Sequence, residues 1–490
     1  MSSERLLLEG QSDRYALTIG LEVHAQIATK AKLFSRASTR FGAAPNTNVS
    51  LVDAAFPGML PRLNQQCVMQ ALKTSLGLNG HINLTSYFDR KNYFYPDLPQ
   101  GYQITQFYTP LMENGFLDIE DALGGTKRIR INRLHIEQDA GKSLHEEGSL
   151  YSAIDLNRVG VGLMEIVTDP DLTSPDEAIT FLKKLRQILI CLGTSDGSME
   201  EGSLRVDANV SVALPLKPLG TRVEIKNLNS FRFLQQAVLY EAHRQISEIE
   251  KGNPIMQETR LFDTQKKETR SMRSKEDAQE YRYFPDPDLP PLVLDPQLVE
   301  RVKAKMPELP EAKKQRFQKE FGLSTYDASI VTADLEVTCF FEETVTLLKH
   351  ATPKLLTNWL MGEVIAAVNE SGIALKANGF HPTHLAQLLE LIATETLSGK
   401  MAKDVFQISW QTGDWPEDIV NQRGFKQINN REELEPLILE ILNAHTEKVL
   451  AYQNGKEKLF GFFVGQVMKQ TSGMANPTLL NRLLKELLAR

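Results

Sequence analysis

The stretch Leu17-Thr-Ile-Gly-Leu-Glu-Val-His-Ala-Gln-Ile27 decides the fold, because apolar and polar residues alternate along it. Such alternation predicts a β-strand with its apolar side against a core and its polar side turned away. The polar side carries Glu22 and His24, two residues apart on one face. A carboxylate beside an imidazole is a suitable start for a divalent metal site, although ordinary solvated strand faces also carry such pairs.

Three further stretches repeat this construction: Arg133–Asp139, Ser203–Leu214 and Arg222–Asn227. If the four strands share one antiparallel sheet, their carboxylates converge on one face, where like charges need a cation or a basic partner. Carboxylates with an imidazole favour Mg²⁺ or Mn²⁺ bound with phosphates, and interleaved Arg and Lys suit those phosphates. The alternative to a metal site is a solvent-exposed sheet face whose charged residues only form salt bridges with one another. The charged residues concerned are Glu22, His24, Glu137, Asp207, Glu224, Arg205, Lys142 and Lys226.

Length and composition indicate a multidomain globular protein. The chain has 490 residues, of which 42% are hydrophobic and 24% charged, which predicts about three domains. A net charge of −7 gives no indication that the protein as a whole binds nucleic acid. Its 3 cysteines are widely spaced without a CxxC pair, which argues against a zinc knot or a disulfide framework. We see no signal peptide or membrane span, and expect a cytoplasmic protein that does not contact membranes.

The predicted fold class is α+β: a large antiparallel-sheet cradle domain, then an α-helical domain, then a small helical tail domain. We place these at residues 1–294, 295–407 and 408–490. The clearest helix of the cradle is Pro175–Leu192, with Ser174 as N-cap and Glu177 completing a capping box. The proline-rich segment Phe284–Pro291 is the expected exit from the cradle, and Gly413–Pro416 is a break before the last helical module.

Common nucleotide-binding motifs are absent. The triplet Gly141-Lys142-Ser143 is not a P-loop, because that motif needs a glycine where Ile136 stands, and no GxGxxG opens a helix. ATP, if bound, would therefore lie on a sheet surface. The segments Asp89–Asp97 and Tyr281–Phe284 mix basic and aromatic residues. Such a mixture suits a nucleotide or an RNA end, but also occurs in ordinary loops and aromatic packing.

Several motifs taken together resemble one family, the B subunit of the aspartyl/glutamyl-tRNA amidotransferases. The resemblance covers nearly the whole chain, with the motifs in order and at suitable spacing. Each is long enough to make chance agreement improbable. They are Ile19–His24, Asp89–Asp97, Arg133–Glu137, Asp139–Ser143, Met199–Arg205, Glu224–Ser230 and Tyr281–Pro285, with Gly465–Lys469 and Ala475–Pro477 in the tail.

The resemblance implies a ligase that forms carbon–nitrogen bonds with glutamine as amido donor. In this family, the B subunit uses ATP to activate the side-chain carboxylate of misacylated Glu-tRNA(Gln) or Asp-tRNA(Asn) as an acyl phosphate. Ammonia, released from glutamine by the glutaminase (amidase) or A subunit, then gives the amide, and a small C subunit is the third member of the heterotrimer. This chain shows no amidase signature, which agrees with glutamine hydrolysis on a partner. The sequence leaves open which of the two tRNAs is used, and DNA is not an expected partner.

The resemblance also implies roles for individual residues. Mg²⁺ would be held by Glu22, His24, Glu137 and Glu224, with Asp207 as a further candidate. Catalysis would involve Glu137, Arg205, Lys226 and Asn227, and ATP would contact Lys142, Asn229 and Arg282. Some members carry a cysteine-ligated zinc in the cradle, but this chain lacks clustered cysteines, and no structural zinc is expected.

The tail differs in charge from the rest of the chain. Between Ala451 and Arg490, six Lys or Arg residues face two Glu residues, a local charge of +4. A locally basic module suits an RNA backbone, whereas the alternative is a helical bundle with solvated lysines. A competing interpretation of the whole chain is a non-catalytic tRNA-binding scaffold. That interpretation fits the tail but poorly explains carboxylates and a histidine gathered on polar strand faces.

Overall fold

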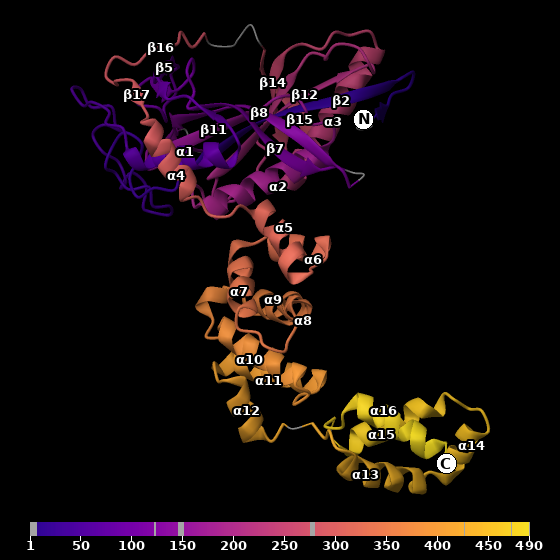
Figure 1. Cartoon of the computed structure of the whole chain (residues 1–490). Coiled ribbons are helices and arrows are strands. Elements are labelled where there is room, and N and C mark those ends of the chain that lie inside the picture. The colour runs from indigo at the N-terminus through magenta and orange to yellow at the C-terminus, as the bar shows by residue number, and fades with distance from the viewer. Residues whose placement is uncertain are drawn as a thin grey trace. The chain divides into compact units, whose positions relative to one another are not determined.

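The structure is a computed structural model that describes residues 7–121, 124–145, 151–274, 280–425, 427–471 and 473–489. The chain divides into two compact units, Met1–Leu309 and Pro310–Arg490. The first unit is built on a large, mostly antiparallel sheet and the second is helical (Figure 1), which confirms the predicted α+β class. In the described residues, no helix is long and apolar enough to cross a membrane.

The centre of the sheet brings the four predicted strands together. Its order is β13 (Val223–Lys226), β12 (Leu204–Ala213), β2 (Arg14–Gln26), β11 (Gly162–Thr168) and β8 (Thr126–Gln138), each antiparallel to its neighbours. The sequence analysis did not foresee β11 between β2 and β8. In the register, His24 lies opposite Arg205 on one side and Glu165 on the other, and Glu165 lies opposite His135.

Shorter strands extend this sheet at both edges. Next to β13 lies a parallel strand, which forms a hairpin with the last strand on that side. Next to β8 the sheet continues through two more strands to an edge strand. These strands are β14 (Glu258–Asp263) and β15 (Glu268–Ser274) on one side, and β6 (Tyr102–Thr105), β5 (Asp89–Asn92) and β16 (Phe284–Pro285) on the other. Off this path lie β1 (Leu7–Glu9), β3 (His81–Ile82) and β7 (Met112–Glu120).

Three helices cover the apolar face of the sheet, and the polar face that carries the charged residues is on the opposite side. These helices are α1 (Gln65–Gly77), α2 (Pro175–Leu192) and α3 (Phe231–Glu250), of which α1 and α2 are seen along one side of the sheet in Figure 1. The α2 bounds agree with the prediction, and Ser174 caps it by accepting from the backbone N–H of Glu177. The capping box differs from the expected form, because Glu177 accepts from the backbone N–H of Thr173 and pairs with Lys127.

The first unit continues beyond the proline-rich segment. Phe284–Pro285 forms the edge strand β16, a position that tolerates proline, and Leu292–Val293 forms β17 against β4 (Thr85–Ser86). Helix α4 (Pro296–Ala304) then buries Val299 and Val302 in the core of the sheet unit. The chain therefore leaves this unit at Leu309, later than the predicted boundary at 294, because the prolines interrupt local structure without ending the core.

The second unit contains two apolar cores. One gathers residues between Phe317 and Val420, and the other gathers residues between Leu434 and Leu488. The predicted tail boundary at residue 408 falls inside α11, which contributes Phe406 to the first of these cores. The first residue that packs against the second core is Ile428, so the division between the two cores lies near that residue. The helices are α5 (Pro310–Phe321), α6 (Thr325–Val331), α7 (Leu335–Val345), α8 (Pro353–Trp359), η1 (Leu360–Val364), α9 (Ile365–Ser371), η2 (Leu375–Ala377), α10 (Pro382–Ala393), α11 (Gly399–Thr412), α12 (Pro416–Arg423), α13 (Arg431–Ala444), α14 (Thr446–Gln453), α15 (Leu459–Gln470) and α16 (Pro477–Leu488).

Candidate functional site

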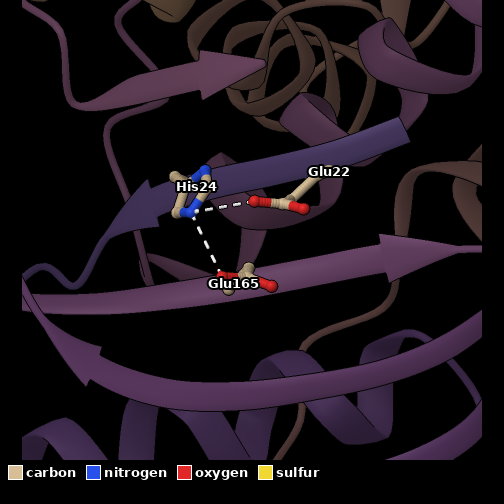
Figure 2. A group of neighbouring side chains, drawn as sticks. All are labelled: Glu22, His24 and Glu165. Atoms are coloured by element: carbon tan, nitrogen blue, oxygen red, sulfur yellow. Dashed lines mark ion pairs between the residues drawn. The ribbon is translucent and has the colours of Figure 1, made fainter. Parts of the chain in front are cut away.

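Carboxylates and imidazoles from three adjacent strands meet on the polar face of the sheet. His24 Nε2 lies 3.3 Å from Glu165 Oε2, 3.6 Å from Glu22 Oε1 and 3.7 Å from Glu137 Oε1. Figure 2 shows Glu22 and His24 on one strand with Glu165 facing them from its neighbour. His135 Nε2 lies 3.5 Å from both Glu137 and Glu165. We call these five residues the carboxylate–histidine cluster.

The strand register explains why the cluster forms. Side chains two residues apart on a strand share a face, and residues opposite each other on neighbouring strands are close. Because His24, Glu165 and His135 stand opposite one another across β2, β11 and β8, the residues two positions away join them. Glu22 and Glu137 are those neighbours. Sequence alternation supplies the face, and pairing with β11 supplies the proximity.

The cluster is largely removed from water. His135, Glu137 and Glu165 are buried, whereas His24 and Glu22 keep 16% and 26% of their side-chain surface exposed. Burial raises the pKa of Glu22, and repulsion from Glu165 raises it further, to about 7. Such shifts mark a site where several carboxylates share a small volume. A cation placed among them would relieve that repulsion.

The histidines experience the opposite balance. Burial alone would lower the pKa of His24, but its hydrogen bond to Glu165 and the nearby carboxylates outweigh burial and raise the pKa to about 9. The pKa of His135 is raised to about 9 in the same way, with Glu165 and Glu137 as the causes. The two imidazoles in turn hold the pKa of Glu165 well below its usual range, although burial acts in the other direction. Without a metal ion, protonated histidines therefore neutralise this cluster.

Two overlapping groups within the cluster have the donor atoms that a divalent metal ion needs. They are Glu22–His24–Glu165 and His135–Glu137–Glu165, with the ligand atoms of each group within 4.8 Å of one another. Carboxylate oxygens with an imidazole nitrogen suit Mg²⁺ or Mn²⁺. Glu165 belongs to both groups and is the central carboxylate of the site.

Basic side chains border the cluster on the β12–β13 side. Lys226 Nζ lies 2.6 Å from Asp207 Oδ2 and 2.8 Å from Glu224 Oε1, and Glu224 also accepts from the hydroxyl of Thr259. Asp207 and Glu224, both predicted as metal ligands, lie outside the two metal-binding groups. They hold Lys226, whose pKa stays raised because these two carboxylates outweigh its burial.

Arg205 is the second basic group at this border. Its Nη2 lies 2.8 Å from Asp139 Oδ2, which also accepts from Gln26. Arg205 Nε is buried and has no hydrogen-bond partner among the described residues. Buried donors are nearly always satisfied in folded proteins, so an unpaired guanidinium donor beside a cavity is suited to a phosphate ligand.

A cavity of about 440 Å³ connects these groups. That volume lies within the range of small-molecule sites, which is roughly 300–1,000 Å³. Asn227, in a left-handed conformation (φ 70°), and Asn229 shape the wall after β13, joined by a 2.9 Å hydrogen bond. Of the residues predicted from sequence, the cavity is lined by Glu22, His24, Glu137, Arg205, Asp207, Lys226, Asn227 and Asn229.

Two predicted ATP contacts do not line this cavity. Lys142 belongs to the hairpin of β9 (Lys142–His145) and β10 (Ser152–Asp155), where it is exposed and stands opposite Asp155. Arg282 is exposed in a left-handed conformation (φ 44°), and its carbonyl accepts from the side chain of Asn92. The hairpin geometry also excludes a helix-opening phosphate loop at Gly141–Ser143.

Sequence reasoning assigned no individual site role to His135, Glu165, Lys91 or Tyr93. Lys91 and Tyr93 do belong to the segment Asp89–Asp97, whose basic and aromatic residues were read as suiting a nucleotide or an RNA end. Glu165 is the single charge in the apolar strand Gly162–Thr168, and that isolation is the signal that could have revealed it. Lys91, within β5, and Tyr93, just after it, also line the cavity. Burial would lower the pKa of Lys91, but Glu137 and other nearby groups outweigh it and raise that pKa.

Comparison with known proteins identifies the family. Residues 17–300 match the model of the GatB/GatE catalytic domain, and residues 339–488 match that of the GatB domain. The chain is 53% identical to the B subunit of the aspartyl/glutamyl-tRNA(Asn/Gln) amidotransferase of Rickettsia felis, over 98% of this chain and 99% of that protein. Its identity to the B subunits of Rickettsia africae and Rickettsia conorii is also 53%, with the same coverage. The chain therefore belongs to the family formed by the B subunits of the aspartyl/glutamyl-tRNA(Asn/Gln) amidotransferases.

Proposed function

We propose that this chain activates the side-chain carboxylate of a misacylated tRNA, Glu-tRNA(Gln), Asp-tRNA(Asn) or both, with ATP and then converts it to the amide. The observation that supports this function is the carboxylate–histidine cluster, which shares one cavity with Arg205 and Lys226. A tRNA-binding scaffold without catalysis gives no reason to gather three carboxylates and two histidines where three of them are buried, because burying charge is costly.

The first half of the reaction transfers a phosphoryl group. The substrate carboxylate attacks the γ-phosphorus, the bond to the β-phosphate oxygen breaks, and ADP leaves with an acyl phosphate on the tRNA. Arg205 and Lys226 bind and orient the phosphates, because phosphoryl transfer depends mostly on positioning and charge neutralisation. Bound Mg²⁺ supplies further neutralisation of the phosphate oxygens. Glu22, His24, Glu137 and Glu165 would hold it.

The second half of the reaction forms the amide. Ammonia attacks the activated carbonyl carbon, inorganic phosphate leaves, and a nitrogen proton must be removed. The departing phosphate can carry that proton away, so the step needs no separate base. The chain's own thiols are poorly suited to releasing ammonia from glutamine: burial raises the pKa of Cys67 to about 11, which suppresses its nucleophilic form. We therefore assign glutamine hydrolysis to a glutaminase partner, the A subunit, within a cytoplasmic heterotrimer whose third member is the small C subunit.

The direct test is amidation by the reconstituted complex on both misacylated tRNAs, with ATP and glutamine. We expect the amide, ADP and phosphate to form in equal amounts and only when Mg²⁺ is present. ADP formation that never leads to an aminoacyl amide would contradict the proposal. Comparing the two tRNAs would also show which substrate this chain uses.

Removing the imidazole of His24 should raise the Mg²⁺ concentration needed for half-maximal ATP hydrolysis. His24→Ala deletes one ligand from the Glu22–His24–Glu165 group, and we expect a shift of about tenfold or more, the scale found for changes around metal sites. The measurement is a Mg²⁺ titration of tRNA-stimulated ATP hydrolysis. His243→Ala, an exposed histidine on α3, is the matched control. An unchanged Mg²⁺ requirement would make His24 a structural residue of the strand.

The chain expressed alone should release no ammonia from glutamine. It offers no activated nucleophile with a matching base at recognisable spacing. Ammonia is measured with a coupled dehydrogenase assay, first on the single chain and then after adding the glutaminase partner. Ammonia release by the purified single chain would disprove the proposed division of labour.

A further inference from the structure

Six aromatic rings form a continuous row that begins at the wall of the cavity. In order they are Tyr95, Tyr93, Tyr281, Tyr283, Phe107 and Tyr108, which we call the aromatic row. Neighbouring ring centroids are 3.8 to 6.0 Å apart, and the shortest spacing is the stacked pair Phe107–Tyr283. Tyr93 lines the cavity, and Lys91 Nζ lies 4.8 Å from the ring centroid of Tyr281. Three separate segments, around residues 93–95, 107–108 and 281–283, thus build one surface.

Backbone contacts hold the rings in place. The N–H of Asn92 donates to the carbonyl of Tyr281 at 2.9 Å, which seats the second segment along the end of β5. The fully buried Asp89 accepts from the backbone N–H groups of Phe107 and Tyr108 at 3.0 and 3.2 Å. The sheet edge therefore positions the row, and the rings need no core of their own to stay ordered.

The row is not part of the hydrophobic core. None of its rings belongs to the core of the sheet unit or packs against it. Tyr108 is 63% exposed, Tyr95 55% and Phe107 42%, whereas Tyr93, Tyr281 and Tyr283 are half-buried. In the part of the chain that the structure describes, no hydroxyl of its tyrosines makes a hydrogen bond. Rings that fill a core are buried and satisfied, whereas exposed rings beside a basic group are typical of surfaces that stack bases of single-stranded nucleic acid.

The geometry of phosphoryl transfer indicates which nucleotide lies there. In an in-line reaction, the attacking oxygen and the leaving ADP stand on opposite sides of the phosphorus. Under the proposed function, Arg205, Lys226 and Asn227, which line the cavity on the side of β12 and β13, would bind the phosphates of ATP there. The row lies next to β5, β6 and β16, and the cluster strands β2, β11 and β8 separate the two sides. The attacking carboxylate must therefore come from the side of the aromatic row.

We propose that the aromatic row stacks the unpaired bases at the acceptor end of the tRNA, beginning with the nucleoside that carries the amino acid. This inference rests on the proposed function. The amino acid is esterified to the terminal ribose, so its carboxylate reaches the cluster only if the terminal base lies just outside the cavity, where Tyr93 and Lys91 stand. Stacking tolerates any base, so the row holds the acceptor end without reading the identity of the tRNA.

The test uses tRNA whose terminal adenine is replaced by 2-aminopurine, a base whose fluorescence is quenched when it stacks. The assembled complex should quench this probe without ATP or glutamine. Tyr93→Ala should weaken the quench and raise the KM for misacylated tRNA roughly tenfold, the usual scale for one base–ring contact, while leaving the KM for ATP unchanged. Tyr93→Phe, which keeps the ring and loses only the hydroxyl, should behave like the wild type.

Two further variants control for folding and for general loss of aromatic surface. Tyr108→Ala changes an exposed ring at the outer end of the row and should weaken RNA binding in the same direction without disturbing the core. Tyr326→Ala removes a ring that is 74% exposed in the helical unit and should have no effect. An increased KM for ATP with unchanged quenching would overturn the proposal and assign the row to the adenine of ATP. Unchanged values throughout would overturn it as well. Because quenching needs no catalysis, a complex that quenches without amidating would refute the proposed function alone.

Discussion

Glu165→Gln should lower the rate of amidation by about a thousandfold while leaving tRNA binding intact. The substitution keeps the shape of the side chain but removes the charge that the two metal-binding groups share. Loss of a metal contact costs several kcal/mol of transition-state stabilisation, and every 1.36 kcal/mol corresponds to about a factor of ten in rate. Glu137→Gln should act in the same direction, since Glu137 contacts both His24 and His135.

The experiment separates a catalytic role from a structural one by two measurements. Amidation is followed with the assembled complex at saturating tRNA, and the pKa values of His24 and His135 are followed by NMR in the metal-free chain. Both should fall in Glu165→Gln, because the Glu165 carboxylate is a main cause of their raised values of about 9. Asp118→Asn is the control, because Asp118 forms an ion pair with the exposed Arg128, and such surface ion pairs contribute little to stability. Full activity in Glu165→Gln would remove Glu165 from the reaction.

Glu165 also shows why sequence alone yields only part of this site. Alternation predicted the polar faces of β2, β8, β12 and β13, because a strand with one buried face alternates apolar and polar residues. The segment Gly162–Thr168 shows no such alternation, because Leu163 and Met164, which point to opposite faces, are both buried, as is Ile166. The strand lies between two other strands of the sheet. A strand buried on both faces has no alternation, so its one carboxylate was not assigned to a face.

Which side chains of different strands lie close together depends on how the strands pair, and the local sequence of one strand does not show its pairing. Asp207 and Glu224 lie on the polar face as expected, but the register places Lys226 between them, and they bind that lysine outside the metal-binding groups. Lys142 is the middle residue of the triplet Gly141–Ser143, which resembles part of a phosphate loop. It instead belongs to a strand that pairs with β10 and does not line the cavity. The aromatic segments 89–97 and 281–284 gained a common surface only through the edge pairing of β5 and β16.

The predicted division at 408 likewise rests on a local signal. Gly413 does end α11 in a left-handed conformation, and Pro416 begins α12, as the sequence indicates. However, Ile419 and Val420 of α12 still pack in the core that contains Phe406. A glycine and a proline mark the end of a helix, whereas the end of a core depends on which distant side chains meet. The three-domain division as a whole remains a prediction.

The helical tail core suggests a more precise cut for testing RNA binding. Its members begin at Leu434, and the backbone of Ile428 pairs with the segment at Ala475. Removing residues 426–490 therefore spares α11 and α12, which a cut at 408 would divide from their core. The exposed lysines at 456, 458, 469 and 485 lie in the removed segment and form no ion pair among the described residues. Arg431, by contrast, pairs with Glu435 and Glu486.

Neutralising those lysines should weaken tRNA binding without touching catalysis. In the assembled complex, the quadruple variant Lys456→Gln, Lys458→Gln, Lys469→Gln, Lys485→Gln is expected to bind tRNA roughly ten- to a hundredfold less tightly at moderate salt. The logarithm of its affinity should also fall less steeply with the logarithm of salt concentration, because fewer counterions are released on binding. The 426–490 deletion should have a larger effect of the same kind.

Binding titrations at two salt concentrations measure both quantities. The matched control neutralises four exposed lysines elsewhere, Lys303, Lys305, Lys319 and Lys376, which changes the net charge by the same amount. If general electrostatic attraction to a polyanion governed binding, both variants would lose affinity alike, because long-range fields depend on total charge. A tail that grips RNA predicts instead that only the tail variant loses salt slope. Basal ATP hydrolysis should persist in both, since the proposed metal ligands and phosphate contacts that line the cavity all lie between Glu22 and Asn229. Equal affinity and equal slope for the tail variant and the wild type would show that its lysines are only a solvated face.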